Sequence, residues 1–317
     1  MVPGLSTHAF FDQRLHPGLL DALAAAGARV GLAGMTIEVF AARHHFNYTD
    51  AQALREIAAW FRSNDVRAVL HQPLYVSDRA DAQWSRHVAP NLNLISTQKT
   101  QRIDAMDEVK RALEAAERIP FAAAVLHLGL RDTAWDDAAI EYSITAIEHL
   151  KAFASPLGMR LLLENLQNEV ATPEHLLYIM KTGHFDNVGV CLDIGHLHLT
   201  AESPGAAPKS REPRPPSNPY AEAFALLGSR IGQLHLHDNH GPFGNFASPT
   251  DMHDEHLWPG EGTVDWSAVH AAAAGLPVDT PGVFEPAPNR ERPAAVVTDQ
   301  AERAFRALLE VDPVASR

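Results

Sequence analysis

The sequence predicts an α/β fold in which eight short strands alternate with helices and close into one barrel of parallel strands. Three observations support this prediction. Eight short apolar runs are separated by segments with helical spacing, and this alternation is typical of a parallel sheet. Eight strand–helix units are the number that closes such a barrel, which commonly has ~250 residues or more. Across all 317 residues no shift in composition marks a second domain.

The strands are placed on apolar runs that end at a polar residue or a turn signal. They are expected at residues 5–11, 35–40, 66–71, 121–127, 160–164, 188–193, 231–236 and 282–285. Gln72-Pro73 closes the third run, and Gly129 follows the fourth, because proline and glycine commonly end regular structure.

The helices are placed on amphipathic spacing and capping residues. They are expected at residues 17–26, 50–62, 97–118, 136–154, 172–180, 220–227, 266–274 and 296–309. Pro17 suits a first turn, Gly27 is expected to stop the first helix, and Asp50 is a plausible N-cap. The proline-rich segment 201–219 is expected to be a surface loop inserted before the seventh strand. Residues 1–317 are therefore predicted to form a single (β/α)8 TIM barrel domain, with its active site at the carboxyl ends of the strands.

Composition restricts the classes of partner. The net charge of −13 disfavours non-specific binding to nucleic acid or to an anionic membrane. Cys191 is the single cysteine, so an intrachain disulfide is excluded and a reducing compartment is favoured. Residues 1–10 lack the pattern of a signal peptide, and no apolar run is long enough to cross a membrane. We therefore expect a cytoplasmic protein; assembly into a homo-oligomer stays open.

The stretch 231–265 concentrates metal-ligating residue types. It contains five histidines, together with Asp238 and Asp254. Between Asn239 and Thr263 there is no lysine or arginine to balance the acidic residues. Zinc, manganese and iron favour such mixtures of imidazole and carboxylate. The stretch therefore indicates a divalent cation.

Candidate ligands recur at the ends of successive predicted strands, or just beyond them, from the third to the eighth. They are His71, His127, Glu164, Asp193, His196, His235, Asp254, His256 and Glu285. In a closed barrel the carboxyl ends of all strands meet on one face. A single histidine there would usually be a satisfied polar residue, but nine ligands at successive strand ends predict a metal site.

These pieces of sequence resemble a known superfamily. The motifs LSTHAF, VLHQP, VLHLG, LLLEN, CLDIGH, LHLHDN, DEHLWPGEGTVDW and GVFEP occur in this order over nearly the whole chain. In that order they resemble the xylose-isomerase-like barrels, which include sugar isomerases and epimerases and also endonuclease IV.

The resemblance implies two alternative sets of metal ligands. In the epimerase branch one divalent ion would be held by residues corresponding to Glu164, Asp193, His235 and Glu285, with His196 touching substrate. In the endonuclease branch three zinc ions would be held, and the additional ligands would correspond to His71, His127, His196, Asp254 and His256. The resemblance thus implies one to three ions per chain, with zinc or manganese favoured.

Several further residues have two interpretations. His237 shares the strand parity of His235, so it points inward as a ligand, an outer partner or a substrate contact. His8 and Glu38 either touch substrate or fill the barrel as polar residues. Arg131 meets a phosphate or carboxylate, or lies on the surface. Trp258 covers the site, or packs its own loop.

The favoured function is that of a metal-dependent isomerase or epimerase of a small sugar, sugar phosphate or polyol. Glu164 and Glu285 would be the catalytic pair, one removing a proton next to a carbonyl and the other returning it through a metal-stabilised enediolate. His8, His196, His237, Arg131 and Trp258 would contact the carbohydrate substrate. The alternative is a zinc phosphodiesterase like endonuclease IV (AP endonuclease family 2); the acidic charge disfavours it because duplex binding needs cations. A barrel that binds metal and ligand without turnover is the third hypothesis.

The ligands divide by position into three groups. Glu164, Asp193, His235 and Glu285 are expected to hold the tightest ion. His71 and His127 end adjacent strands and can share a second ion. His196, Asp254 and His256 form a third site at the rim, which is expected to bind more weakly.

Overall fold

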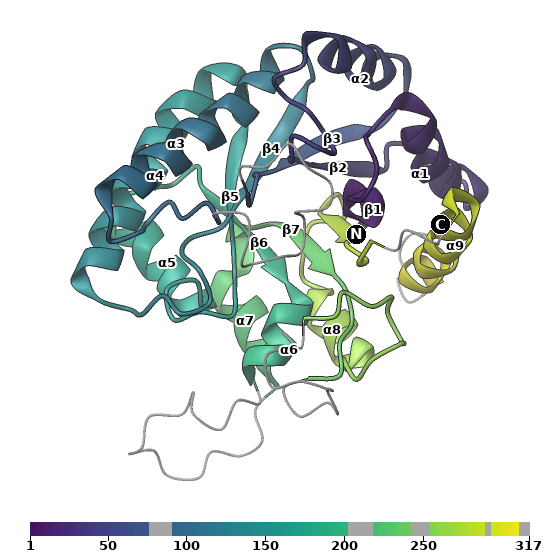
Figure 1. Ribbon diagram of the computed structural model, residues 1–317. Coiled ribbons are helices and arrows are strands. Elements are labelled where there is room, and N and C mark those ends of the chain that lie inside the picture. Colours follow the sequence, from purple (N-terminus) through teal and green to yellow (C-terminus); the bar gives the residue numbers. More distant parts are fainter. Residues whose placement is uncertain (76–90, 202–217, 242–253, 289–292, 311–317) are drawn as a thin grey trace.

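The strands close into a barrel in the computed structural model, which describes residues 1–75, 91–201, 218–241, 254–288 and 293–310. In this part of the chain eight parallel strands pair in sequence order, and β8 pairs with β1. The strands are β1 Val2–Ser6, β2 Thr36–Phe40, β3 Arg67–His71, β4 Phe121–Leu126, β5 Arg160–Glu164, β6 Gly189–Asp193, β7 Ile231–Leu236 and β8 Pro281–Phe284. The predicted α/β TIM barrel is confirmed (Figure 1).

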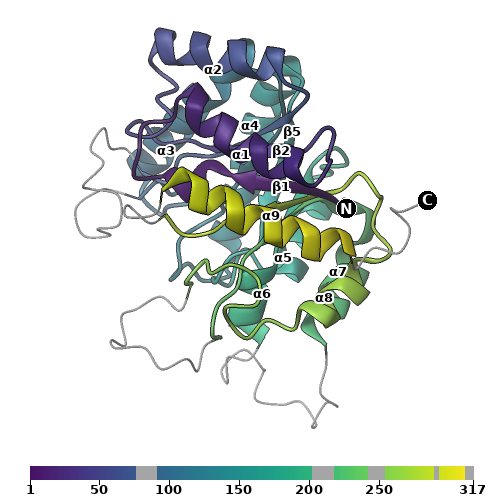
Figure 2. The same ribbon diagram turned by 90° about the vertical axis from the view of Figure 1, so that its right-hand side faces the viewer.

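Helices surround the barrel. They are α1 Pro17–Arg29, α2 Ala51–Ser63, α3 Lys99–Leu113, α4 Asp137–Ala154, α5 Pro173–Thr182, α6 Ile194–Ala201, α7 Pro219–Leu227, α8 Trp266–Ala273 and α9 Ala294–Glu310, with 3-10 turns η1 Thr7–Phe10, η3 Glu114–Glu117, η4 Ser155–Leu157 and η5 Gly228–Arg230. The Asp50 side chain accepts from the N–H groups of Gln52 and Ala53, as its expected N-cap role requires. Helices α1 and α9 lie side by side, so the last helix completes the outer layer next to the first (Figures 1 and 2).

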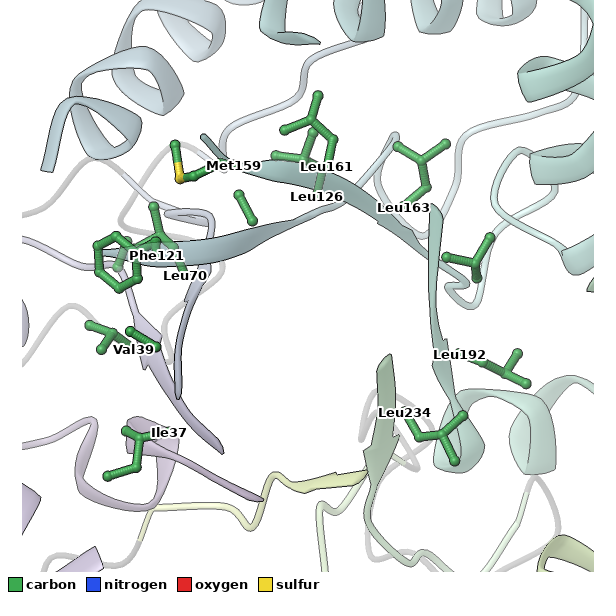
Figure 3. Close-up of a cluster of buried hydrophobic side chains, with 14 of the residues drawn as sticks. Ile37, Val39, Leu70, Phe121, Leu126, Met159, Leu161, Leu163, Leu192 and Leu234 are labelled. Carbon is green, nitrogen blue, oxygen red and sulfur yellow. The ribbon is translucent and has the colours of Figure 1, made fainter. Parts of the chain in front are cut away.

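The main core lies between the strands and the helices. Alternate strand residues, among them Ile37, Leu70, Leu163 and Leu234, are buried on the outer side of the barrel (Figure 3). The residues between them point inward, because successive side chains of a strand face opposite sides. On one side of the barrel the interior is apolar and is filled by Val69, Ala123, Val125, Leu162 and Cys191.

The inward positions nearer the carboxyl ends are polar. His71, Glu164, Asp193 and His235 occupy them, and every one of these side chains is buried. The strand register places Asp193 beside His235 on neighbouring strands β6 and β7. The same alternation that buries leucines outside therefore collects the candidate ligands inside.

The structure corrects two predicted boundaries, one at Ser6 and one at Gly27. The first strand ends at Ser6 rather than at residue 11, because the Ser6 hydroxyl accepts from the His8 N–H and starts the turn η1. Gly27 does not stop α1, which continues to Arg29. Gly27 has no side chain, and Met35 packs in the space this leaves: a Cβ at Gly27 would lie only 2.6 Å from the Met35 sulfur.

Helix α6 was not predicted. It follows β6 without a break, and the Asp193 carboxylate accepts from the His196 N–H at 2.7 Å. A helix of eight residues directly after a strand leaves little periodic signal in the sequence. Most of the proline-rich segment 201–219, namely residues 202–217, lies outside the described residues. Within the described residues no helix is both long enough and apolar enough to cross a bilayer.

Candidate metal centre

Four strands bring one set of buried ligands together, which we call the core cluster. Glu164 and Asp193 end β5 and β6, His235 lies on β7, and Glu285 directly follows β8. His235 Nδ1 lies 3.4 Å from Glu164 Oε1, 3.4 Å from Glu285 Oε2 and 3.7 Å from Asp193 Oδ2. Ligands ~2.1 Å from a tetrahedral ion are about 3.4 Å apart, so these separations fit one cation.

A second set, the strand-three cluster, consists of His71, His127 and Glu164. His127 Nε2 lies 3.0 Å from Glu164 Oε2 and 3.1 Å from His71 Nε2. His71 Nε2 lies 3.5 Å from the same carboxylate oxygen. Glu164 therefore belongs to both sets: its Oε1 faces the core cluster, and its Oε2 faces the two histidines.

The third set, the rim cluster, gathers three imidazoles around Asp254. His196 Nε2 lies 3.1 Å from Asp254 Oδ2, and His256 Nε2 lies 3.4 Å from Asp254 Oδ1. His237 Nε2 is 3.9 Å from Asp254 Oδ1 and 3.1 Å from Asp193 Oδ1, so it also contacts the core cluster. His256 has a φ of 48°, a strained backbone conformation of the kind that concentrates at functional sites.

Backbone carbonyls orient three of these histidines. The Nδ1 atoms of His71, His196 and His256 lie 2.8–2.9 Å from the carbonyl oxygens of Gln72, Asn165 and Glu285, respectively. A carbonyl only accepts hydrogen bonds, so each Nδ1 carries a proton and each neutral ring presents its Nε2 lone pair to its cluster. Metal-binding histidines typically show this arrangement.

Buried carboxylates raise the pKa values of the histidines beside them. Burial acts to lower the pKa of His256, but Asp254 overcomes it and raises that pKa to about 9. Burial also acts to lower the pKa of His196. The Asp193 and Asp254 carboxylates outweigh burial and raise that pKa well above its usual range. Burial also works to lower the pKa of His235, yet carboxylates that include Glu38 and Glu164 help to raise it well above the usual range.

The two glutamates of the core cluster are pushed in opposite directions. Burial raises the pKa of Glu285, and nearby histidines offset this only in part. Burial also acts to raise the pKa of Glu164, but His127 and His235 overcome it and hold that pKa well below the usual range. Paired groups whose pKa values diverge are typical of an acid and a base in one active site.

The donor sets fit divalent metal. Among the described residues His235 Nδ1 has no hydrogen-bond partner, although it is buried and faces three carboxylates. A neutral ring would turn its lone pair toward acceptor oxygens, which is repulsive unless a proton or a cation lies between them. All three sets hold ligand atoms within 4.8 Å of one another, and their mixture of imidazole and carboxylate suits zinc or manganese.

Two cavities that share lining residues adjoin the clusters. The inner cavity has a volume of about 100 Å³, and its lining includes His8, Phe40 and side chains of all three clusters. The outer cavity, about 770 Å³, shares His127, His196 and Asp254 with it and is also lined by Arg131, Gln167 and Asn168. The structure thus places His8 and the exposed Arg131 beside the predicted site.

The structure places two other residues away from the clusters. Trp258 is buried in the main hydrophobic core with its ring 6.4 Å from that of Phe284. Asp238 accepts hydrogen bonds from the N–H groups of Gly260 and Val264 and from Trp266 Nε1. It therefore holds the loop that follows His256. The sequence left the role of His237 open, and the structure places its ring beside Asp254 in the rim cluster. The sequence feature that indicated an inward side chain was its strand parity with His235.

A family model described as "Xylose isomerase-like TIM barrel" matches residues 23–308. Among curated proteins, an uncharacterised protein of Methanocaldococcus jannaschii is 27% identical over 186 residues, which are 56% of this chain and 55% of that protein. A second uncharacterised protein of the same organism is 24% identical, over 65% of each chain. The matched stretches thus span 55% and 65% of these two relatives, less than two thirds of either.

Solved structures share the fold at low identity. A D-tagatose 3-epimerase-like protein superposes with a TM-score of 0.65 at 20% identity and 98% coverage of both chains. The IOLI protein, solved with a bound zinc atom, gives a TM-score of 0.71 at 16% identity and the same coverage. D-psicose 3-epimerase from Clostridium cellulolyticum H10, solved with D-tagatose, gives 0.65 at 16% identity, with 98% of this chain and 97% of that chain covered.

Proposed function

Because the chain belongs to the xylose isomerase-like TIM barrel family, we propose that it is a divalent-metal-dependent isomerase or epimerase of a small sugar, sugar phosphate or polyol. The observation that carries the proposal is the core cluster, in which Glu164 and Glu285 converge on one buried histidine. Neighbours of the same fold include sugar epimerases, which supports this class of substrate.

The core cluster would hold the ion, with Glu164, Asp193, His235 and Glu285 as ligands. When bound, the ion would polarise the substrate carbonyl and stabilise the charge of an enediolate. Glu164 is the ionised carboxylate and would accept the proton from the carbon next to the carbonyl. Glu285, whose pKa is raised by burial, would return a proton from the far side of the cluster.

The other lining residues would bind and orient the substrate. The reacting carbons would lie in the inner cavity, where His8 and His196 can contact hydroxyl groups. His196 is held by the Asn165 carbonyl, so its ring is fixed before substrate arrives. Arg131 in the outer cavity would meet an anionic substituent, such as the phosphate of a sugar phosphate.

Solvent isotope exchange tests this function. Metal-replete protein is incubated in heavy water with a panel of ketoses, aldoses and their phosphates, and products are analysed by NMR. We expect deuterium at the carbon next to the carbonyl. Turnover without any deuterium in product, at early and late times, would argue against a solvent-exchanging intermediate. Conversion of no member of the panel by metal-replete protein would count against the sugar class.

The three adjoining clusters favour a second candidate, a multinuclear zinc phosphodiesterase. Glu164 is shared between two clusters, as a bridging carboxylate would be. Against this candidate, Arg131 is the one lysine or arginine among the described residues that line the two cavities. Nicking of abasic duplex DNA by zinc-loaded protein, with salt-dependent binding, would establish it and displace the isomerase proposal.

A further inference from the structure

Glu38 lies on β2, inside the barrel and among the buried polar groups next to the core cluster. The side chain of Glu38 is fully buried, and so are the side chains of Gln233 and His235 on β7. Glu38 Oε2 accepts from Gln233 Nε2 at 2.6 Å and lies 2.9 Å from His235 Nε2. Strands β2 and β7 are separated by β1 and β8 in the closed sheet, so this contact crosses the barrel interior.

The contact decides which nitrogen of His235 faces the core cluster. An ionised carboxylate only accepts hydrogen bonds, so the proton of His235 belongs on Nε2, between the ring and Glu38. Nδ1 is then left on the opposite edge, 3.4 Å from both Glu164 and Glu285. In this orientation the ring donates to the buried Glu38 oxygen from one edge and presents a lone pair to the three carboxylates from the other.

His235 differs in this respect from the other oriented histidines. Neutral backbone carbonyls hold Nδ1 of His71, His196 and His256, whereas a carboxylate holds His235. A carboxylate partner draws the Nε2 proton more strongly than a carbonyl does and makes the other nitrogen a better ligand. The low polarity of the buried site strengthens this effect.

Burial of Glu38 also needs an explanation. A buried carboxylate is costly unless it is paired, and in the part of the chain that the structure describes its ionic partner is His235. Gln233, on the same strand as His235, donates to the same Glu38 oxygen, so the carboxylate accepts from both side chains. The three side chains thus form one buried hydrogen-bonded unit that ends at the ligand atom.

We propose that Glu38 is a positioning residue for the core ion: it holds His235 so that Nδ1 is the ligand atom, and Gln233 holds Glu38. The inference rests on the proposed function only in taking the core cluster as the metal site. Removing the carboxylate should weaken the core ion while leaving the strand-three and rim clusters unchanged, since neither contains Glu38 or His235.

Metal affinity tests the proposal directly. Full-length wild type and Glu38→Gln are titrated with Zn²⁺ or Mn²⁺ against a competing chelator. We expect the tightest ion to bind about 10–100-fold more weakly in Glu38→Gln, the usual loss when a partner of a metal ligand is removed. Glu38→Asp keeps the charge but moves it away from His235 by one methylene, so it should also lower the affinity for the core ion. This variant replaces Glu38→Gln in the test if Glu38→Gln does not fold.

Glu108→Gln is the matched control. Glu108 is likewise a buried glutamate, but it is paired with Arg43 at 2.7 Å and Arg111 at 2.8 Å. Its replacement should lower stability without changing metal affinity. NMR of ring ¹⁵N in zinc-loaded protein should show the ion on His235 Nδ1 and the proton on Nε2.

Each outcome separates this inference from the proposed function. Folded Glu38→Gln that holds the tightest ion with wild-type affinity, or zinc on His235 Nε2, would overturn the inference and leave the enzyme proposal standing. Weakened metal in the variant together with no proton exchange at carbon in the wild type would overturn the enzyme proposal alone. A wild type that binds no divalent ion would overturn both.

Discussion

Glu164 joins two clusters through its two carboxylate oxygens, and Glu285 faces it across His235. If these carboxylates move the substrate proton, Glu164→Gln and Glu285→Gln should each reduce turnover by about 10²–10⁴-fold, the usual effect of removing a positioned acid or base. Turnover and metal content are measured on the same samples, because loss of the ion would add to the effect.

Glu148→Gln, an exposed glutamate on α4, is the surface control and should retain wild-type activity. A Glu164→Gln or Glu285→Gln variant that keeps its metal and full activity would remove that glutamate from the catalytic pair.

The rim histidines make metal binding depend on pH. His256 has a pKa of about 9, and that of His196 is also raised, so in the metal-free protein both rings carry extra protons at neutral pH. An ion must displace those protons. Affinity at the rim should therefore fall as pH drops below about 9, by about tenfold per pH unit for each proton displaced.

Proton release can be counted by calorimetric metal titration in buffers of different ionisation enthalpy. His256→Asn should release fewer protons per rim ion than the wild type. Equal rim affinity at pH 6 and pH 9 would contradict the assignment of these rings as protonated ligands.

At the scale of elements, the start of α6 is shaped around His237. A Cβ at Gly195 would lie 2.0 Å from His237 Cε1, closer than any real contact. Gly195→Ala should therefore displace His237 and disturb Asp193, at a cost of about 1–3 kcal/mol for the overpacking. Urea unfolding measures this loss, and metal titration should show a weakened core ion.

Gly275→Ala is the control, since nothing lies within 4 Å of a Cβ at Gly275. If Gly195→Ala keeps both the stability and the metal affinity of this control, the close packing of His237 against α6 is not needed for folding or for metal binding.

Asp238 anchors the loop between β7 and α8. It accepts from Gly260 at 2.8 Å, Val264 at 3.0 Å and the Trp266 indole at 2.9 Å. Asp238→Asn replaces one acceptor oxygen by a donor, so at least one buried N–H loses its partner, at about 1–3 kcal/mol. We expect the rim ion to weaken before the core ion, because Asp254 and His256 belong to the same loop.

Asp265→Asn is a suitable comparison, because Asp265 caps α8 through the Ala268 N–H and asparagine caps helices about as well as aspartate. Elemental analysis of both variants measures how many ions each retains and so tests whether Asp238→Asn loses the rim ion first. Loss of the core ion alone in Asp238→Asn would contradict the proposed role of the loop.

For the molecule as a whole, the number of ions separates the two candidate functions. His71 and His127 are brought together by adjacent strands β3 and β4. The double replacement His71→Ala with His127→Ala should remove one ion and leave the core ion, because none of the core ligands is replaced. Elemental analysis of protein purified without chelator measures both numbers.

Two results would decide between the candidates. A wild type with one ion, and a double variant with full isomerase activity, would assign these histidines to the substrate or to structure. A wild type with three zinc ions, and a double variant without phosphodiesterase activity, would favour the hydrolase.

The sequence by itself determined the barrel and the list of candidate ligands. Strand parity is local: a period of two places Glu164, Asp193 and His235 on the inner side of any closed barrel. The predicted limits of β5 and β7 agree with the structure, because long apolar runs with clear ends define strands well. The boundary at Ser6 was wrong because a hydroxyl cap, rather than periodicity, determines it. The prediction of a helix stop at Gly27 was wrong because close packing against Met35, which the sequence does not reveal, accounts for the glycine.

The tertiary structure alone decided which candidate ligands are shared between clusters and how they are held. Glu164 contacts two clusters, and His237 contacts both Asp193 and Asp254. These contacts depend on distances between side chains that lie far apart in the sequence. Pairing of Glu38 with His235 joins positions 38 and 235 across the barrel, and no local pattern encodes it. Such contacts arise only when the sheet closes, because closure fixes which strands face each other across the interior.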